Sequence, residues 1–175
     1  IIYLSNMYKS LIKYYRISYI FLFCLTLNGE IMLDDSDVLT TPLPLPYDGN
    51  VYSVNDLNKF INTTIQSDKQ PILIFGANWC PDCRILAGTL KMPSVNKFIQ
   101  ENYSIMHVDL GRYDINMPLL EVLGIPKQEG VPRVVIFDKE GKALNLDTHD
   151  RWRTARDSKQ QEIFNYFQKY ALISN

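Results

Sequence analysis

One short segment, Pro71-Ile-Leu-Ile-Phe75, constrains the fold more than any other part of the chain. It is wholly apolar, it ends at Gly76, and its length suits a strand better than a helix. A strand without an alternating polar face is buried on both faces, and its sheet then needs covering layers on both sides. We therefore expect an α/β fold built around this strand.

The patterns on either side of this strand predict a parallel pair. Before it, Ser53 and Asp56 have the spacing of a capping box at the start of an amphipathic helix. After it, a helical pattern that Pro93 interrupts leads to an expected strand at Ser104–Leu110. Strand, helix and strand in this order imply a right-handed crossover between parallel strands.

The C-terminal third predicts an antiparallel pair and a last helix. Arg133–Phe137 has the pattern of a third strand, and a turn leads from it to a fourth near Ala143–Leu146. Asp157 is placed to cap the final helix, and we interpret Arg151-Trp152-Arg153 as a solvated loop. The predicted fold is a four-stranded mixed sheet with helices on both faces.

The N-terminal 50 residues differ in character from the rest. Residues 1–29 hold three basic residues and no acidic one, followed by the apolar run Ile17–Leu27. This pattern is typical of a secretory signal peptide, with an N-terminal anchor as the alternative, because a membrane span needs about 20 apolar residues. Alternating prolines near the end of residues 30–50 predict an extended linker, so the domain is expected over 51–175.

The charge balance and the number of cysteines exclude two classes of protein. Eighteen basic and 19 acidic residues are interspersed, so we expect no nucleic-acid partner. Of three cysteines, Cys24 falls within the expected signal. Only Cys80 and Cys83 remain, which is too few for a structural disulfide framework.

The Cys80-Pro81-Asp82-Cys83 segment follows the buried strand and opens a helix. As the helix N-cap, Cys80 would face free backbone N–H groups that stabilise its thiolate, and Pro81 suits the first helical position. One turn on, Cys83 can attack a mixed disulfide on Cys80. The spacing therefore predicts thiol–disulfide exchange.

Other interpretations of two closely spaced cysteines fit less well. A zinc site needs four ligands, and only His107 and His149 are available besides the cysteines, without the usual paired spacing. Covalent haem attachment requires histidine where Arg84 stands. Two inert buried thiols remain an alternative. We expect neither a metal nor a cofactor.

Two motifs together carry a family resemblance. Gly76-Ala-Asn-Trp79-Cys80-Pro-Asp-Cys83-Arg84, followed by Gly130-Val131-Pro132 before a strand, resembles the thioredoxin superfamily over about residues 51–175. The resemblance implies a thioredoxin-like fold in which Pro132 is cis and lies against the active-site disulfide. It also implies that the Val131 backbone pairs with an extended substrate.

The resemblance extends to exported bacterial thioredoxin-like proteins. These contain a Val-Asp-x-Gly-Arg-Tyr-Asp-like segment, here Val108 to Asp114. By this resemblance Trp79 flanks the active site and limits access to it; a core aromatic is the alternative. The chain departs from the family at Ile74, where many thioredoxins carry a buried carboxylate that assists proton transfer.

Asp82 bears on the redox potential. A carboxylate beside Cys80 opposes the thiolate and makes the pair a stronger reductant, unless Arg84 neutralises it. A solvated carboxylate that favours the helix N-terminus is the alternative.

Together these features predict a thiol–disulfide oxidoreductase that acts on protein disulfides or thiols, with the reductase or isomerase direction favoured. We expect a monomer exported to the bacterial periplasm and re-reduced by a membrane thiol–disulfide electron donor. A non-catalytic binding module with the same fold and a copper-delivery protein are the alternatives.

Overall fold

The computed structural model describes residues 29–127 and 130–173. Almost all of the expected signal or anchor therefore lies outside the described residues. The chain divides into two units, residues 1–30 and 31–175, and every helix and strand of the described residues belongs to the second unit. Within the described residues, no helix is long and apolar enough to cross a membrane.

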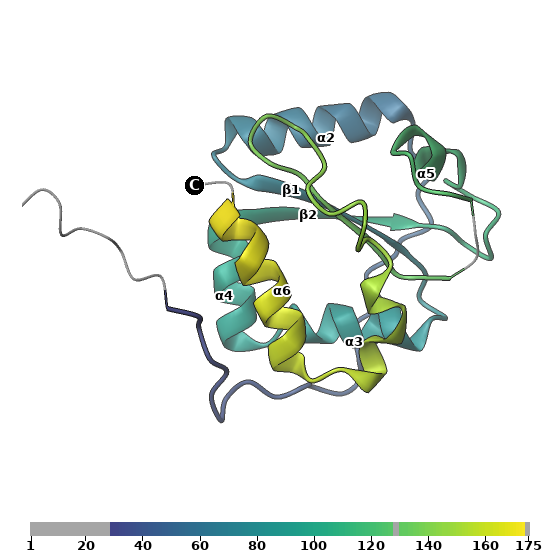
Figure 1. Ribbon diagram of the computed structural model, residues 1–175. Coiled ribbons are helices and arrows are strands. Elements are labelled where there is room, and N and C mark those ends of the chain that lie inside the picture. Colours follow the sequence, from purple (N-terminus) through teal and green to yellow (C-terminus); the bar gives the residue numbers. More distant parts are fainter. Residues whose placement is uncertain (1–28, 128–129, 174–175) are drawn as a thin grey trace, which may run out of the picture. The chain divides into compact units, whose positions relative to one another are not determined.

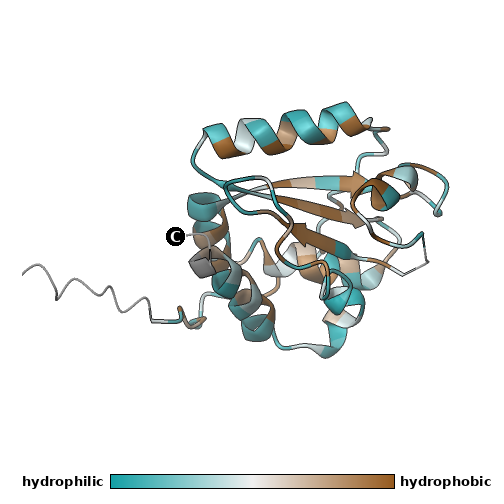
Figure 2. Cartoon of the chain, turned by 45° about the horizontal axis from the view of Figure 1, so that its top comes forward, coloured by the Kyte–Doolittle hydropathy of each residue, from teal (hydrophilic) through white to brown (hydrophobic). Residues whose placement is uncertain are grey.

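Three strands form a mixed sheet in the order β2-β1-β3. The central strand β1 (Gln70–Gly76) is buried along its whole length, as its apolar run predicts. It pairs in parallel with β2 (Tyr103–Asp109) and antiparallel with β3 (Arg133–Ile136). Figure 2 shows these strands as mainly hydrophobic ribbons between helices that carry hydrophilic stretches.

Helices cover both faces of this sheet (Figure 1). Helix α2 (Val54–Gln66) lies on one face and begins with the predicted capping box of Ser53 and Asp56. The opposite face and the sheet ends carry the remaining helices: α3 (Pro81–Thr89), α4 (Pro93–Asn102), α5 (Pro118–Val122), the 3-10 helix η1 (Arg151–Asp157) and α6 (Gln160–Ile173).

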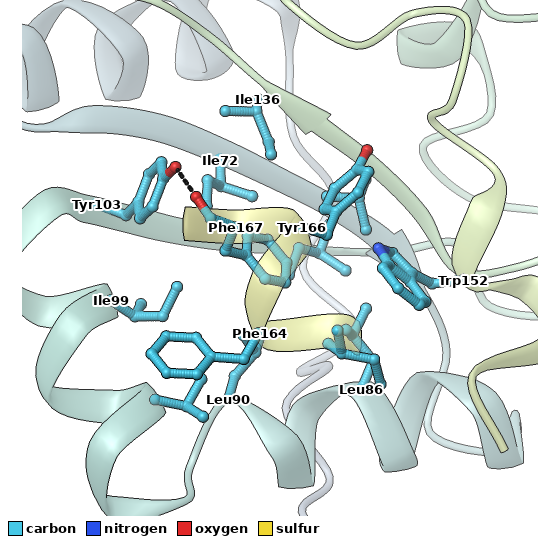
Figure 3. Packing of buried hydrophobic residues seen from close by; sticks show 14 of the residues in the cluster. Ile72, Leu86, Leu90, Ile99, Tyr103, Ile136, Trp152, Phe164, Tyr166 and Phe167 are labelled. Carbon is cyan, nitrogen blue, oxygen red and sulfur yellow. Dashed lines mark hydrogen bonds between the residues drawn. The ribbon is translucent and has the colours of Figure 1, made fainter. Parts of the chain in front are cut away.

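Two hydrophobic clusters hold the layers together. The larger one joins alternate residues of the sheet to α3, α4 and α6, with Phe164 and Phe167 wholly buried (Figure 3). In the same view the Tyr103 hydroxyl donates to the Phe167 carbonyl, at 2.7 Å. The second cluster joins β1 to α2 and α5, and it includes Cys80 and Cys83. The cysteines thus lie within a packed core.

The predicted fourth strand is absent from the described structure. Near Ala143–Leu146 the chain makes only one isolated bridge, Phe137 with Ala143. Beside it, the side chain of Asn145 takes the place of a strand: its Oδ1 accepts from Ile136 N at 2.8 Å, and its Nδ2 donates to Val134 O at 2.8 Å. The buried side-chain amide of Asn145 therefore hydrogen-bonds the edge of β3 in place of a fourth strand. The predicted thioredoxin-like α/β fold class is confirmed, but with three strands.

The segment 30–50 forms no helix or strand, but it is more than a tether. Residues 31–50 run along the domain, and Gln168 pairs with both backbone groups of Ile31 at 2.6 and 2.9 Å. Tyr47 is 4 % exposed and belongs to the second cluster. The prediction that residues 30–50 are an extended linker outside the domain is therefore wrong for Tyr47, which lies in its core.

Two local predictions near the C-terminus are also wrong. Trp152, expected in a solvated loop, is wholly buried against the edge of Tyr166, with ring centroids 5.2 Å apart. Asp157 ends η1 and does not cap the last helix, which begins at Gln160. The 3-10 helix η1 holds both residues, and its Trp152 packs into the larger hydrophobic cluster.

Candidate functional site

Cys80 and Cys83 lie at the junction of β1 and α3. Cys80 is the N-cap of α3, and its Sγ accepts a hydrogen bond from the backbone N–H of Cys83 at 3.3 Å. Pro81 occupies the first helical turn, where a backbone N–H would have no acceptor within the helix, so the missing N–H of proline costs no hydrogen bond. The two cysteines are free thiols one helical turn apart.

The two thiols differ in acidity. A hydrogen bond from the Cys83 thiol, with smaller help from the backbone N–H groups of Cys83 and Asp82, lowers the pKa of Cys80 from 9.0 to about 7. Burial raises the pKa of Cys83 far above its ordinary value, and its bond to the Cys80 sulfur adds to that effect. Near neutral pH the Cys80 thiol is therefore partly ionised, whereas Cys83 keeps its proton.

Both sulfur-bearing residues are buried, Cys80 to 4 % exposure and Cys83 to 1 %. Their neighbours Trp79 and Pro81 are exposed, so these two side chains lie at the surface beside the buried sulfurs. The Cys80 thiol donates to the carbonyl of Val131 at 3.5 Å, and the Val131–Pro132 peptide bond is cis. The loop before β3 therefore lies directly against the Cys80 sulfur.

Trp79 rests on the segment that follows β2. Its Nε1 donates to Gly111 O at 2.6 Å, the guanidinium of Arg112 lies 5.2 Å from its ring, and Tyr113 packs edge-on at 5.7 Å. Gly111 has a φ of 56°, and a side chain there would collide with Asp114. With 41 % of its surface exposed, Trp79 is a side chain of the site's rim, and the core-aromatic alternative is wrong.

Asp82 is neither solvated nor paired with Arg84. It is 2 % exposed and forms an ion pair with Arg156 of η1, whose Nε lies 2.9 Å from its Oδ1 and whose backbone N–H donates to the same oxygen at 3.0 Å. Burial would raise the pKa of Asp82, but these bonds lower it below 3.8. Arg84 instead donates to Leu43 O at 3.2 Å. The neutralising cation is Arg156.

Tyr47 completes the buried side of the site. Its hydroxyl lies beside Cys83 against Gly76, where a Cβ would come within 2.8 Å of the Cys83 sulfur and overlap the hydroxyl. Its ring packs edge-on against His107 at 5.3 Å. Sequence patterns gave no signal for Tyr47 or Arg156, because each reaches the site from a segment far away along the chain.

The site offers little for a metal. Among the described residues, no group of three or more histidine, cysteine and acidic side chains could hold an ion. His107 faces Tyr47, and burial lowers its pKa to about 4, while His149 lies 3.4 Å from Arg133. Neither histidine therefore forms a metal-binding group with the cysteines in the described part of the chain.

Comparisons with known proteins indicate the family to which the chain belongs. A family model described as thioredoxin-like matches residues 55–139. The crystal structure of a disulphide isomerase from Xylella fastidiosa Temecula1 is 31 % identical, with a TM-score of 0.65, over 73 % of this chain and 98 % of that chain. The oxidised C-terminal domain of DsbD from Neisseria meningitidis is 21 % identical, with a TM-score of 0.41, over 60 % and 97 %. No curated protein matches the chain.

The chain therefore belongs to the thioredoxin-like family. Family and paired cysteines together support thiol–disulfide oxidoreductase chemistry in general.

Proposed function

We propose that this protein exchanges disulfides with other proteins, using Cys80 to attack and Cys83 to resolve. The observation that carries the proposal is the position of the Cys80 sulfur. It is held at the N-terminus of α3 by the Cys83 N–H and against the carbonyl of Val131. A thiol with a pKa of about 7 is half ionised at neutral pH and is therefore an effective nucleophile.

The reaction runs through a mixed disulfide. The Cys80 thiolate attacks one sulfur of a substrate disulfide, forms a bond to it and displaces the other sulfur as a thiolate that takes up a proton. Cys83 then loses its proton and attacks the Cys80 sulfur, which releases the substrate as a second thiol. The protein is left with a Cys80–Cys83 disulfide and the substrate with two thiols.

The substrate would lie over Trp79 and along the loop that ends in Pro132. Trp79 presents an exposed aromatic face, and Val131 presents backbone beside Cys80. An extended peptide placed there could pair with that backbone while its disulfide reaches the sulfur. Protein disulfides and thiols are accordingly the proposed substrates.

We place the reaction in the reductase or isomerase direction. A nucleophilic thiol with a pKa near 7 gives the reduced form modest stabilisation, whereas strongly oxidising pairs have thiols with a pKa of about 3.5. The Arg156 ion pair weakens the opposing charge of Asp82 but does not remove it, since that carboxylate still raises the pKa of Cys80. The similarity to a structure described as a disulphide isomerase supports the same direction.

The proposed location is the bacterial periplasm. The basic and apolar pattern of residues 1–29 supports export. A reductase or isomerase in an oxidising compartment must be re-reduced after each turnover, so a membrane thiol–disulfide electron donor is the proposed partner.

Trapping of substrates tests the proposed function. In cells that express Cys83→Ser, Cys80 should accumulate mixed disulfides with other proteins, because the resolving thiol is gone. The matched control is the double variant Cys80→Ser, Cys83→Ser, which should trap none. Equal recovery of proteins with both variants would show that Cys80 does not react and would favour a binding module.

A further inference from the structure

Tyr47 is held in a fixed position beside the active-site helix. Its backbone pairs with the side chain of Asn78, which accepts from Tyr47 N at 3.1 Å and donates to Tyr47 O at 2.6 Å. Its ring is 4 % exposed and packs edge-on against His107, with an interplanar angle of 85°. A segment without helix or strand thus delivers one aromatic side chain to a defined place in the core.

The buried hydroxyl of Tyr47 has no hydrogen-bond partner of regular geometry among the described residues, but it lies beside the Cys83 thiol and lowers the pKa of that thiol. It shares the space over Gly76 with the sulfur of Cys83, and any larger residue at position 76 would collide with both. A buried hydroxyl without a partner is unfavourable, and native proteins seldom keep one without a reason. While Cys83 is a protonated thiol, the Tyr47 O–H group lies beside it and is free to donate a hydrogen bond to its sulfur.

Few groups near Cys83 can help it to ionise; besides Tyr47, a hydrogen bond with the backbone of Ala77 lowers its pKa. Ile74, at the place of the family's buried carboxylate, has no titratable group. The carboxylate of Asp109 accepts from the backbone of Gly49 and Gly111, at 3.1 and 2.8 Å. His107 is neutral above a pH of about 4, and its Nδ1 is buried without a partner in the described part of the chain.

We propose that Tyr47 is a catalytic residue for the resolving half of the reaction: its hydroxyl donates a hydrogen bond to the Cys83 thiolate as that thiolate forms. The pKa of Tyr47 lies well above 10 because the group is buried beside both thiols, so it acts as a donor and keeps its proton. This role rests on the proposed function of the two cysteines.

The step balances without any further reagent. The Cys83 S–H bond breaks and its proton goes to solvent, while the Tyr47 O–H turns its hydrogen toward the sulfur. The thiolate forms a bond to the Cys80 sulfur, the bond from Cys80 to the substrate breaks, and the departing sulfur takes up a proton from solvent. Tyr47 ends the step unchanged. In the reverse direction it stabilises Cys83 as the leaving thiolate.

Titration of Cys83 in a Cys80→Ala background tests the proposal without any substrate. The ultraviolet absorbance of the thiolate is followed against pH with Tyr47 present and with Tyr47→Phe. Loss of a hydrogen bond to a charged group should reduce the thiolate fraction at pH values below the midpoint about tenfold, and so move the midpoint upward. Identical titration curves would overturn the proposal.

Tyr103→Phe is the matched control. It removes another buried hydroxyl, one that donates to Phe167 O away from the cysteines, and should leave the Cys83 titration unchanged. A rise in the Cys83 midpoint of the same size in this variant would show that general loosening of the core is the cause, and would also overturn the proposal.

A single-turnover experiment then links the titration to the reaction. Resolution of a preformed mixed disulfide on Cys80 should slow about threefold in Tyr47→Phe at neutral pH, because a tenfold loss of thiolate is partly offset by its greater nucleophilicity. The slowing should diminish as the pH rises. An unchanged rate and pH profile would refute the role of Tyr47 in resolution. Failure of the proposed function would instead appear as a mixed disulfide that never resolves even with Tyr47 in place.

Discussion

Replacing Cys83 by alanine removes the group that contributes most to the acidity of Cys80. The hydrogen bond from the Cys83 thiol is the largest cause that lowers the pKa of Cys80 from 9.0 to about 7, ahead of the backbone N–H groups of Cys83 and Asp82. In Cys83→Ala the two backbone bonds remain to oppose the effect of burial, so the pKa of Cys80 should rise toward 9.0.

The size of the effect follows from the two limits. At pH 7 a thiol with a pKa of about 7 is about half ionised, whereas one with a pKa of 9.0 is about 1 % ionised. The thiolate fraction of Cys80 should therefore fall in Cys83→Ala by up to about fiftyfold. Greater nucleophilicity of the less acidic thiol would offset part of this, which leaves a loss of up to about sevenfold in alkylation rate.

Alkylation by iodoacetamide across a range of pH measures both quantities. The midpoint of the rate profile gives the pKa of Cys80, and the plateau gives its nucleophilicity. Cys83→Ser is the matched control, because its hydroxyl can still donate and should keep the midpoint below that of Cys83→Ala. A midpoint that stays near 7 in Cys83→Ala would refute this reasoning and assign the acidity to the N-terminus of α3.

Three further predictions follow from other contacts. Arg156→Ala should raise the pKa of Cys80, because the buried carboxylate of Asp82 loses its counter-charge. Asp82→Asn should lower the pKa of Cys80, because it removes that carboxylate. Alkylation profiles that move in the same direction in the two variants would contradict this prediction. His107 has a pKa of about 4 in the folded chain against 6.5 when exposed, so the unfolded chain binds its proton first and folding stability should fall as the pH drops from 6.5 to 4, by at most about 3 kcal/mol. Urea unfolding at several pH values should show this loss, and His107→Phe should abolish it; an equal loss in that variant would assign the acid sensitivity to another group. Phe164→Ala should cost about 3–5 kcal/mol of unfolding free energy at neutral pH, since Phe164 is wholly buried, and a cost below about 1 kcal/mol in urea titrations would show that the cluster repacks.

Local patterns were sufficient for much of the fold. The apolar run of β1, the parallel crossover to β2 and the capping box of α2 each depend on residues close together in the chain, and all three are present. The prediction of a fourth strand was wrong because Asn145 hydrogen-bonds the edge of β3 through its side chain. No periodicity reveals that a side-chain amide will replace a strand.

The candidate site also contains residues that local sequence predicts and residues that only tertiary packing places. The position of Cys80 at the start of α3 follows from a strand that ends four residues earlier, and the sequence contains that information. The partner of Asp82 lies 74 residues away in η1, the helix that holds the buried Trp152. Tyr47 comes from a proline-rich segment whose composition predicts only an extended chain. Contacts that depend on tertiary packing could not be derived from spacing alone.

A single-turnover reaction between the fully reduced protein and a protein disulfide such as that of insulin shows whether Cys80 and Cys83 exchange disulfides. Mass analysis after acid quenching should show one Cys80–Cys83 disulfide formed for each substrate disulfide reduced, and Cys80→Ser should give neither product. Reduction of the substrate by Cys80→Ser, or a wild-type protein whose two thiols stay reduced, would contradict the account.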